Sequence, residues 1–386
     1  MTGRLPMTEQ LREAGRVRPL HVVQVSFFND PMGRRPQELL RAWPTVVDVA
    51  EAAALAGARV TVIQASTHRG NLSRNGVDYH FLPLHRSALG ELMRSHKPDV
   101  LHVQGLGFAR DVLALAQLAP GIPILLQDHA SRPPRWWRRS LWRRGLAAAA
   151  GVAFCAREQA QPFAQSGLLH ERLRIYEIPE SPSRFKPGDQ AEARRATGLS
   201  GDPGVLWVGH LDKNKDPLTV LEGVSHAVDA LPDLHLWCCF GAAPLLPEVR
   251  SRIEADPRLR HRVSLLGRVP HERVELLMSA ADIFVSGSHR EGSGYSVIEA
   301  MACGLPPVIT DIPSFRTLTG NAAVGALWPC DDARQLTIAL QQVAARVKAE
   351  SRRAVRAHFE RELSLEAVGR KLVAAYGELA GGNGHA

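Results

Sequence analysis

The sequence lacks the features that would place the protein in a membrane or outside the cell. No uninterrupted apolar run approaches the ~20 residues that a membrane span needs. The first residues, up to Leu20, are polar and contain no hydrophobic segment of the kind found in secretory signal peptides. We therefore expect a protein that is not exported and that works in the cytoplasm.

Cysteines are few, and their spacing is typical neither of a metal site nor of a redox pair. Most lie in apolar contexts that suggest core packing in a reducing compartment. The five are Cys155, Cys238, Cys239, Cys303 and Cys330. The sequence also has no Asp-x-Asp motif in a loop after a predicted strand. Nothing in it therefore requires a metal or another cofactor.

The chain does have length and positive charge. Its 386 residues are enough for two domains of ordinary size, and its 45% hydrophobic and 22% charged content is typical of soluble globular proteins. The formal net charge of +8 and the pI near 9.6 indicate an anionic partner. That partner could be a nucleic acid, a nucleotide or a membrane surface, and charge alone does not choose among them.

The first half of the chain alternates predicted strands and helices. Short apolar runs predict buried strands, and the longest helical pattern extends from about Gln37 to Ala56. The predicted strands are His21–Phe28, Ala58–Gln64, Val77–Leu84, Asp99–Val103, Ile122–Gln127, Gly151–Cys155 and Leu173–Ile178. Alternation of this kind predicts a parallel sheet covered by helices on both faces.

The stretch Pro179–Gly188 interrupts this alternation with three prolines and a glycine, a composition typical of a linker between domains. A second series of strands and helices begins at Gly204. We therefore predict an α/β protein with two Rossmann-like doubly wound domains, an N-terminal one over residues 18–184 and a C-terminal one over residues 185–363. Ligands of such domains bind beyond the carboxyl ends of the strands, so two facing domains would form a cleft.

One segment of the second half places two glutamates, Glu291 and Glu299, eight positions apart around a Gly-Ser-Gly turn. The apolar run Asp282–Ser286 before it predicts a buried strand, and the helical spacing of apolar residues after it predicts a helix. Gly292 and Gly294 have no Cβ and let the backbone approach a ligand closely. The amides that open the following helix would attract phosphate.

Glu299 could also have a purely structural role. The spacing of Ser296 and Glu299 also fits a capping box, in which the two side chains satisfy free amides at the start of a helix. The sequence leaves both roles open, and they do not exclude each other.

Two other predicted strand ends in the second half carry glycine and basic residues. Val208–Leu221 contains Gly209, His210 and two lysines, and Leu266–His271 contains Gly267 and Arg268. Because parallel strands end at the same edge of a sheet, these loops would lie beside the two glutamates. Lysine and helix amides there could bind the phosphates of a nucleotide diphosphate, and the glutamates could bind sugar hydroxyls.

With these residues, nearly the whole chain resembles the family 4 retaining glycosyltransferases of the GT-B fold. The strongest part is the segment from Glu291 to Ile309, which resembles the glutamate–seven residues–glutamate signature and the alanine-methionine-alanine helix of that family. The resemblance implies two domains facing each other across a cleft, with the C-terminal helix 364–380 packed back on the first. It also implies a nucleotide diphosphate-sugar as the donor substrate.

By this resemblance, Glu291 would hold hydroxyls of the donor sugar near the reacting carbon, and Glu299 would hold the ribose hydroxyls. The backbone amides of Gly292, Ser293, Gly294 and Tyr295 would reach the diphosphate or the sugar.

The resemblance also assigns roles outside this segment. Lys215 matches the lysine that neutralises the leaving diphosphate. His129, in Gln127-Asp-His, resembles a cleft histidine that approaches the donor sugar. His102 fits a further family position, which we place on the acceptor side.

Two positions depart from the family pattern. The first is His210, where the family usually has an arginine that is always charged, whereas histidine is only partly protonated near neutral pH. Lys213 or an arginine elsewhere could make up the charge. The second is the loop after the first strand, where family members often carry a double glycine.

That loop reads Asn-Asp-Pro-Met-Gly-Arg-Arg and ends with Gly33, Arg34 and Arg35. These residues are candidates for gripping an anionic or lipid-linked acceptor, although the arginines could equally be solvated loop charges.

The stretch Arg132–Arg144 combines arginine and tryptophan more densely than any other part of the chain. Tryptophan at the headgroup level and arginine on phosphate would suit a membrane surface or an anionic acceptor. The alternative is a solvated basic helix face whose tryptophans pack inward. Stacking on single-stranded nucleic acid would use the same residue types, but no recognition helix or RNA-binding motif accompanies them. A nucleic-acid partner is therefore not expected.

The residues and the resemblance predict a metal-independent hexosyl- or related transferase that moves a sugar from a nucleotide diphosphate-sugar to an acceptor with retention. The predicted location is cytoplasmic, with possible contact to the inner face of the membrane. Three alternatives stay open: a sugar-nucleotide hydrolase or epimerase on the same scaffold, a basic nucleic-acid-binding protein, and a non-catalytic partner subunit. The donor sugar, the base, the acceptor and the oligomeric state are not predicted.

Overall fold

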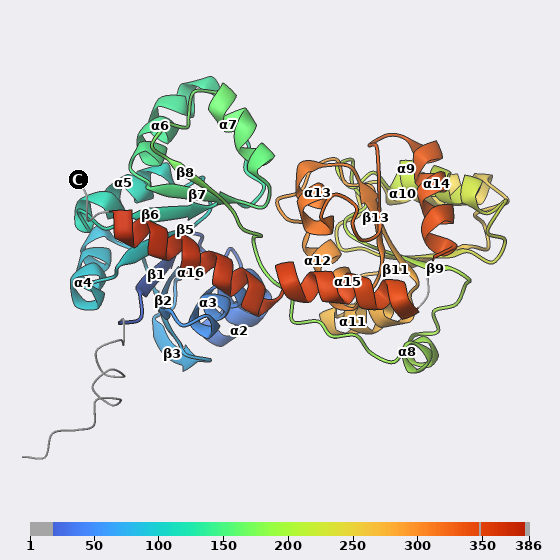
Figure 1. Ribbon diagram of the computed structural model, residues 1–386, viewed down its shortest axis with the longest axis horizontal. Helices are drawn as coiled ribbons and strands as arrows, with labels where there is room; N and C mark the ends of the chain where they lie inside the picture. The colour runs from blue at the N-terminus through green and yellow to red at the C-terminus, as the bar shows by residue number, and fades with distance from the viewer. Residues whose placement is uncertain (1–17, 347–348, 383–386) are drawn as a thin grey trace, which may run out of the picture.

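The computed structural model describes residues 18–346 and 349–382 and divides them between two α/β bodies that lie side by side (Figure 1). Residues 1–17, which make up most of the polar segment before Leu20, lie outside the described residues. Among the helices of the described part, none is both long and apolar enough to cross a membrane.

The first body is built on one eight-stranded sheet. Its strands are β1 (His21–Ser26), β2 (Arg59–Ala65), β3 (Gly70–Arg74), β4 (Val77–Leu82), β5 (Val100–Gln104), β6 (Ile124–Gln127), β7 (Gly151–Phe154) and β8 (Arg174–Glu177). They lie in the order β3-β4-β2-β1-β5-β6-β7-β8, and all neighbours are parallel except β3 and β4. The helices are α2 (Pro36–Ala42), α3 (Pro44–Leu55), α4 (Arg86–His96), α5 (Ala109–Leu118), α6 (Arg139–Ala147) and α7 (Gln161–Gln165), with 3-10 turns η1 (Trp136–Arg138) and η2 (Arg157–Ala160).

The second body is built on a six-stranded, fully parallel sheet. Its strands are β9 (Gly204–Val208), β10 (His235–Cys239), β11 (Val263–Gly267), β12 (Ile283–Ser286), β13 (Pro307–Thr310) and β14 (Ala326–Trp328), in the order β11-β10-β9-β12-β13-β14. Its helices are α8 (Gln190–Thr197), α9 (Pro217–Ala227), α10 (Leu246–Ala255), α11 (His271–Ala280), α12 (Tyr295–Ala302), α13 (Pro313–Thr319), α14 (Ala333–Ala344) and α15 (Ala349–Glu362).

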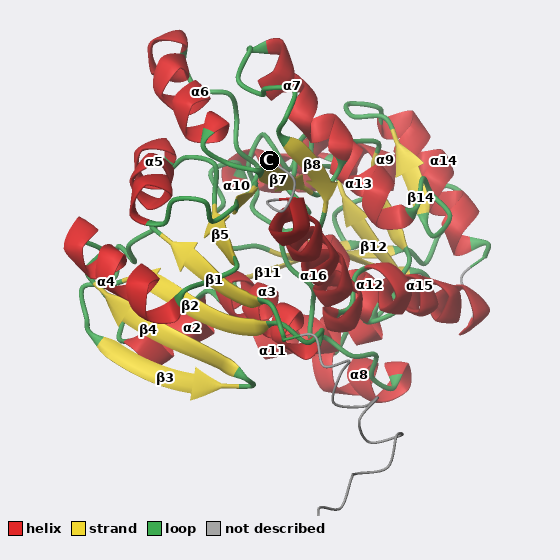
Figure 2. Cartoon of the chain, turned by 60° about the vertical axis from the view of Figure 1, so that its left-hand side comes forward, coloured by secondary structure: helices red, strands yellow, loops and turns green. Residues whose placement is uncertain are grey.

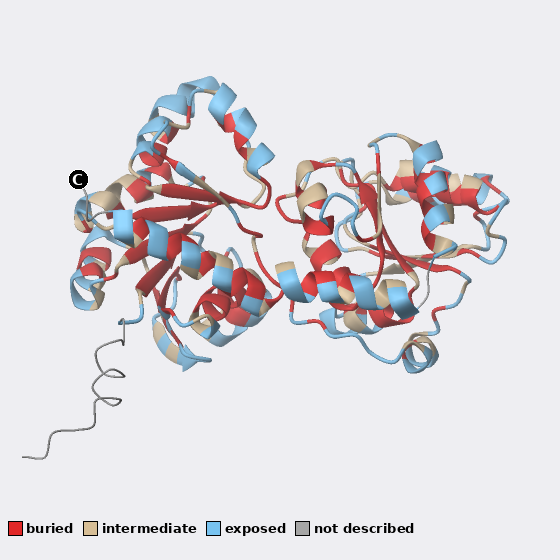
Figure 3. Ribbon diagram, in the orientation of Figure 1, coloured by how far each residue is buried: buried red, intermediate tan, exposed pale blue. Residues whose placement is uncertain are grey.

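Alternation along the strands puts apolar side chains on both faces of each sheet. In β1, Val23 and Val25 belong to the core on one face and Val22 to the core on the other. In β9, Leu206 and Val205 divide in the same way. Helices cover both faces, so the strands are buried along most of their length (Figure 3). As in other parallel sheets, the carboxyl ends of the strands are the places left for ligands.

The last helix, α16 (Leu365–Gly381), leaves the second body and lies along the first (Figure 1). It packs against α3, where a Cβ on Gly369 would lie 2.1 Å from the carbonyl oxygen of Ala52. α15, which precedes it, packs beside α12. The chain therefore crosses between the bodies a second time after the stretch Pro179–Gly188.

Two details of the first body differ from the sequence prediction. The helix expected from about Gln37 to Ala56 is two helices, because Pro44 has no amide hydrogen and its ring clashes with a preceding helical turn. Strand β3 lies at the outer edge of the sheet and was not predicted (Figure 2). Its side chains are mostly exposed, so it has no apolar alternation to detect.

Candidate active site

Strand β12, a glycine loop and helix α12 form the centre of the site. Gly294 precedes the first helical residue with a φ of +76°, a left-handed conformation that glycine adopts at low cost. A Cβ there would lie 2.4 Å from the ring of Phe315, so a larger residue would not fit. No side chain caps the start of α12. Its first amides therefore stay available to a ligand.

The capping-box interpretation of Ser296 and Glu299 is wrong. α12 begins at Tyr295, so Ser296 already lies inside the helix. The Glu299 carboxylate instead contacts His271, the first residue of α11, with 2.5 Å between Oε1 and Nε2. The carboxylate of Glu299 therefore does not cap α12, and its partner in the structure is His271.

The environment of Glu299 tunes the ionisation of its carboxylate. Burial raises the pKa of Glu299, while the hydrogen bond and the charge of His271 oppose that rise. The same hydrogen bond raises the pKa of His271. The imidazole of His271 packs against the ring of Phe185, with 4.7 Å between centroids, and lies nearly parallel to the ring of Tyr295 at 6.5 Å; these contacts hold its orientation.

Lys215 and Glu291, 76 positions apart in sequence, meet in a hydrogen-bonded ion pair between Nζ and Oε1. Lys215 lies in the loop after β9, where its amide donates to the carboxylate of Asp212 at 3.0 Å. Both side chains are mostly buried, with 20% and 15% of their surface exposed. The structure therefore brings together two of the three residues predicted to be catalytic.

These side chains line a cavity of about 570 Å³ between the two bodies, which we call the first cavity. Most predicted donor-binding residues line it as well: Gly209, His210, Gly292, Ser293, Gly294, Tyr295 and Glu299. Gly267 and Arg268, at the end of β11, do not line it.

His210 presents one defined donor to the first cavity. The amide of Ala242 donates to its Nδ1 at 3.1 Å, so the proton of the neutral ring lies on Nε2. A second proton on Nδ1 would displace this contact. With Nδ1 accepting from Ala242, His210 offers the first cavity a single N–H in place of the fork of N–H groups of an arginine.

His129, the third residue predicted to be catalytic, does not itself line the first cavity. Its Nε2 is 2.8 Å from Oε1 of Gln104, and its Nδ1 is 3.6 Å from Oε2 of Glu180. Glu180 does line the cavity. His129 is therefore separated from the first cavity by the carboxylate of Glu180, a residue that the sequence analysis did not predict.

His102 is fully buried in β5 and has no surface in the cleft. Its Nδ1 is 2.7 Å from the hydroxyl of Tyr376 on α16, and its Nε2 is 3.4 Å from Nε2 of Gln104. Burial lowers the pKa of His102 to about 3, so the ring is neutral. The acceptor-side position predicted for His102 is not supported, because its contacts are all internal. It supports His129 through Gln104 instead.

The loop with Gly33, Arg34 and Arg35 is held by its own contacts. Asp30 accepts from the backbone and from the guanidinium of Arg34 at 2.8 Å each, and the amide of Arg35 donates to Glu38. None of these three predicted residues lines the first cavity.

Contacts between the two bodies hold the loop Glu291–Gly294, which we call the signature loop. Nε2 of Gln159 donates to the carbonyl oxygens of Glu291 and Gly292 at 2.8 Å each. The amide of Glu180 donates to Oγ of Ser293 at 2.7 Å. A Cβ on Gly292 would lie 1.3 Å from Oε1 of Glu180, so this glycine is needed for the bodies to meet.

Sequence reasoning missed three ionisable residues of the first cavity: Arg41, Glu180 and His271. His271 carried a signal, because it follows the glycine loop of β11 at the start of a helix. Arg41 lies inside a helical pattern and Glu180 in a proline-rich stretch, and neither has a motif around it.

One group of side chains in the described residues has the spacing of metal ligands: Asp216, His289 and Asp331. Its members already contact each other, with His289 Nε2 at 3.2 Å from Asp216 and 3.7 Å from Asp331. Asp331 is largely exposed and Asp216 also caps α9, so the group carries no metal assignment.

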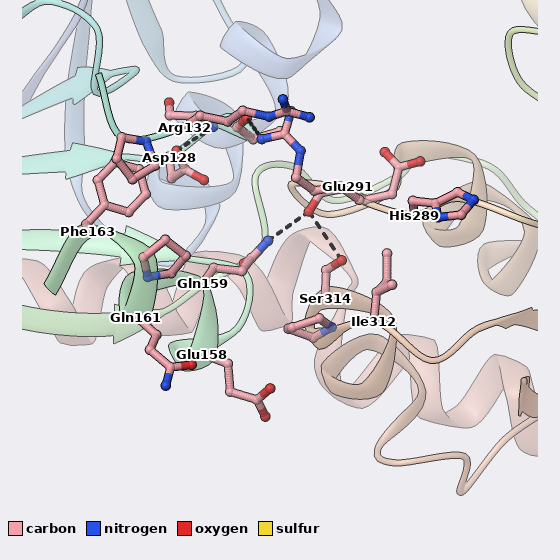
Figure 4. A pocket seen from close by; sticks show the side chains of 16 residues that line it. Asp128, Arg132, Glu158, Gln159, Gln161, Phe163, His289, Glu291, Ile312 and Ser314 are labelled. Atoms are coloured by element: carbon pink, nitrogen blue, oxygen red, sulfur yellow. Dashed lines mark hydrogen bonds between the residues drawn. The ribbon is translucent and has the colours of Figure 1, made fainter. Parts of the chain in front are cut away.

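A second cavity, of about 520 Å³, shares Glu291 and Ala130 with the first. Figure 4 shows the side chains that line this second cavity. Its walls come from the loop after β6, from η2 and α7, and from the loop before α13. Phe163 and Ile312 belong to these walls. The two cavities are therefore neighbours, with Glu291 in the walls of both.

Comparison with known proteins supports the fold and the family. Residues 42–179 match the family model described as Glycosyltransferase Family 4, and residues 189–357 match Glycosyl transferases group 1. The chain is 27% identical over 276 residues to GDP-mannose:cellobiosyl-diphosphopolyprenol alpha-mannosyltransferase of Xanthomonas campestris, covering 69% of this chain and 70% of that one.

Solved structures share the whole architecture. A glycosyltransferase from Rickettsia africae superposes with a TM-score of 0.70 at 14% identity, covering 94% of this chain and 99% of the other. Anabaena HepE in complex with UDP gives 0.68 at 16% identity, covering 93% and 100%. The predicted fold class, GT-B with two Rossmann-like domains, is confirmed. Because the two family models between them match most of both bodies, the chain belongs to the group 1 glycosyl transferases of Glycosyltransferase Family 4.

Proposed function

We propose that this protein transfers a sugar, with retention, from a nucleotide diphosphate-sugar bound in the first cavity to a hydroxyl of an acceptor. The observation that carries the proposal is the convergence of Lys215, Glu291, Glu299 and the uncapped start of α12 on one cavity between the bodies. The Xanthomonas relative, whose name states a GDP-mannose donor, supports the donor class.

The chemistry requires stabilisation of a leaving diphosphate, which carries the charge that develops in the transition state. The Lys215 ammonium has three N–H donors, so it can keep Glu291 and also contact a phosphate oxygen. The amides of α12 and the guanidinium of Arg41 add positive potential at the same wall. His210 contributes one hydrogen-bond donor, from Nε2.

In the proposed step, the bond from the anomeric carbon to the diphosphate oxygen breaks, and the acceptor oxygen bonds to that carbon from the same face. The acceptor proton passes to the departing diphosphate. Glu291 orients the transferred sugar through its hydroxyls, and Glu299 holds the ribose. With these cations in place, the proposal requires no metal or other cofactor.

The acceptor is proposed to be anionic or lipid-linked, and the protein to act at the cytoplasmic face of a membrane. Exposed arginines and tryptophans between Arg132 and Arg144 support this location. The Xanthomonas relative, whose name states a diphosphopolyprenol acceptor, supports the acceptor class.

A thermal-shift screen of nucleoside diphosphates and their sugars tests the donor assignment, because a bound ligand raises the apparent stability. At least one nucleotide sugar should stabilise the protein. Glu291→Gln should keep the stabilisation by the nucleoside diphosphate and lower kcat about 10²- to 10³-fold, as for loss of one transition-state contact.

Glu248→Gln, at an exposed position of α10, is the matched control and should behave as the wild type. The anomeric configuration of the product reports retention. If no nucleoside diphosphate or nucleotide sugar stabilises the protein, the proposed function is wrong.

A further inference from the structure

One side chain of the first body, Gln159, holds two consecutive carbonyl groups of the signature loop. Its Nε2 donates to the carbonyl oxygens of Glu291 and Gly292 at 2.8 Å each. Figure 4 shows the first of these contacts beside a longer one, 3.4 Å from Oγ of Ser314 to the same oxygen. Among the described residues, the carbonyl of Gly292 has no other hydrogen-bond donor. Gln159 is therefore the main partner of both carbonyl groups.

The side-chain amide of Gln159 can take only one orientation at this place. Its Oε1 accepts from the backbone amide of Ala156, the residue before η2, at 2.8 Å. Turned over, the group would set its oxygen against two carbonyl oxygens and its NH₂ against the amide of Ala156. The three contacts therefore make Gln159 a donor toward the signature loop, and the two hydrogens of Nε2 match the two carbonyl oxygens.

Each of these carbonyl groups shares a peptide unit with an amide of the loop. The carbonyl of Glu291 is joined to the amide of Gly292, and the carbonyl of Gly292 to the amide of Ser293. The C=O and N–H bonds of a trans peptide unit point in opposite directions. Neither of these two units is cis. Because the carbonyl groups are turned toward Gln159, the two amides point away from it.

The two amides therefore face the first cavity. Gly292 and Ser293 line the first cavity, whereas Gln159 lines the second. Neither amide has an acceptor within the part of the chain that the structure describes. The hydrogen bonds from Gln159 also polarise the two peptide units, which strengthens their N–H groups as donors. A sugar hydroxyl beside Glu291 would thus meet amide donors and a carboxylate acceptor together.

Resting on the proposed function, we infer that Gln159 is a positioning residue for the transferred sugar. It turns the amides of Gly292 and Ser293 toward the first cavity, where they donate to hydroxyl oxygens of that sugar beside Glu291. Gln159 belongs to the first body and the amides to the second, so the sugar subsite is complete only where the bodies meet. The nucleoside diphosphate part of the donor is held by other residues of the second body and does not depend on Gln159.

Gln159→Glu tests this role, because it keeps the size of the side chain and an oxygen for the amide of Ala156. It replaces the donor with a second oxygen, which repels the two carbonyl groups. Calorimetry on the full chain measures two ligands. One is the nucleotide sugar that stabilises the wild type most in a thermal-shift screen that includes GDP-mannose and UDP-glucose, and the other is its own nucleoside diphosphate. The variant should bind the nucleotide sugar about tenfold more weakly or worse, and the nucleoside diphosphate within about twofold of the wild type.

The pH dependence separates positioning from packing. A protonated carboxyl group has one O–H donor, so the defect of Gln159→Glu, relative to the wild type at the same pH, should shrink as the pH falls. Gln159→Ala removes the donor without adding repulsion, so its defect should be smaller at neutral pH and should not vary with pH. Gln165→Glu makes the same chemical change at an exposed position of α7 outside both cavities, and should bind both ligands as the wild type does.

Equal affinity of Gln159→Glu and the wild type for the nucleotide sugar would overturn the inference. A matching loss of affinity for the nucleoside diphosphate would overturn it as well, and so would a defect that is the same at every pH, since packing alone would explain it. In each case, binding of the nucleoside diphosphate by the wild type leaves the proposed donor site standing. If the wild type binds neither ligand, the proposed function and this inference are both wrong.

Discussion

At the scale of single residues, the contact between Glu299 and His271 opposes the effect of burial on a carboxylate of the site. Only 4% of the Glu299 side chain is exposed, and burial of that degree favours its neutral form. An ionised carboxylate can accept hydrogen bonds from two ribose hydroxyls through its two oxygens. In a protonated carboxyl group one of the two oxygens carries a hydrogen and acts as a donor. His271 opposes the effect of burial on the pKa of Glu299.

This balance predicts a pH-dependent defect in His271→Ala. Without His271, burial raises the pKa of Glu299 further, so less of the carboxylate is ionised as the pH falls. Affinity for the nucleoside diphosphate should fall about tenfold or more, the range expected for loss of a charge-assisted hydrogen bond worth about 1.5–3 kcal/mol. The defect should be largest at low pH and shrink as the pH rises.

Binding titrations at several pH values between about 5 and about 8 measure this defect. His271→Gln, which keeps a neutral hydrogen-bond donor, is the comparison variant and should show a smaller defect. A loss of affinity that is the same at every pH would show that His271 acts only through packing against Tyr295.

The residues that could be predicted from sequence are those fixed by local motifs. Glu291, Glu299 and Lys215 follow strand ends, and strands of a parallel sheet end at one edge, so their meeting follows from the fold class. The direction of a side chain is not fixed in this way. His129 has the expected place after β6, yet it points to Gln104 and leaves the cavity wall to Glu180.

At the scale of secondary-structure elements, α16 links the C-terminal end of the chain to the cleft. Tyr376 on this helix contacts His102, which is joined through Gln104 to His129. With Nε2 of His102 accepting from Gln104, its Nδ1 donates to the hydroxyl of Tyr376. In this chain the Gln104 amide sets which nitrogen of each ring carries the proton, and the Tyr376 hydroxyl is the hydrogen-bond partner of Nδ1 of His102.

Tyr376→Phe removes the hydroxyl that contacts Nδ1 of His102 and should therefore disturb this chain of hydrogen bonds. The buried Nδ1 of His102 loses its partner, which should lower the free energy of unfolding by about 1–3 kcal/mol. The Gln104 amide can then turn, so we expect kcat to fall and its pH profile to shift, while the KM for the donor stays unchanged. Steady-state kinetics across pH measure both effects.

Leu379→Ala is the matched control on the same helix. Leu379 is buried in the same hydrophobic core, and a leucine side chain makes no hydrogen bonds. It should lower stability by about 2–5 kcal/mol without moving the pH profile. If the two variants have the same kinetic behaviour, Tyr376 has only a packing role.

Elements with apolar periodicity were predicted, and those that depend on neighbours were not. Most strands of both sheets are buried apolar runs, so their positions could be read from composition, whereas the exposed edge strand β3 could not. The residue at which α12 begins could not be read from the sequence, because the spacing of Ser296 and Glu299 fits a helix that begins after Ser296 equally well. The clash of Phe315 with any side chain at Gly294 is a tertiary contact with no local signal.

At the scale of the whole molecule, the two bodies meet through polar contacts around the site. Gln159 and Glu180 of the first body bind the signature loop of the second. Arg184, in the stretch between the bodies, contacts Asp48 and Glu51 at 2.6 Å each. Since Gln159 lines the second cavity and Glu180 the first, a bound donor and acceptor would be enclosed by both bodies at once.

The first body also presents the surface that we propose contacts a membrane. Trp136 and Trp137 are 76% and 54% exposed, and the guanidinium of Arg135 lies over the ring of Trp137 at 5.2 Å. Trp142 is buried, so inward packing holds for this tryptophan only. An acceptor with an apolar group would be presented from a membrane, and Arg132 of this segment lines the second cavity. The exposed rings and Arg132 of the cavity wall thus belong to the same segment of chain, Arg132–Arg144.

Binding to vesicles that contain anionic phospholipid should therefore need both the rings and the charge. Replacing Trp136 and Trp137 together with alanine should abolish most of the binding, because the interfacial anchors are removed. Arg138→Ala should lower it about fivefold, since one arginine near an anionic surface contributes ~1 kcal/mol. Leu276→Ala, at an exposed apolar position of the second body, should have no effect.

Added salt should weaken binding of the wild type more than that of Arg138→Ala, because screening acts on the charge that the variant has lost. Equal sedimentation of the double tryptophan variant and the wild type with these vesicles would place the membrane contact elsewhere on the molecule.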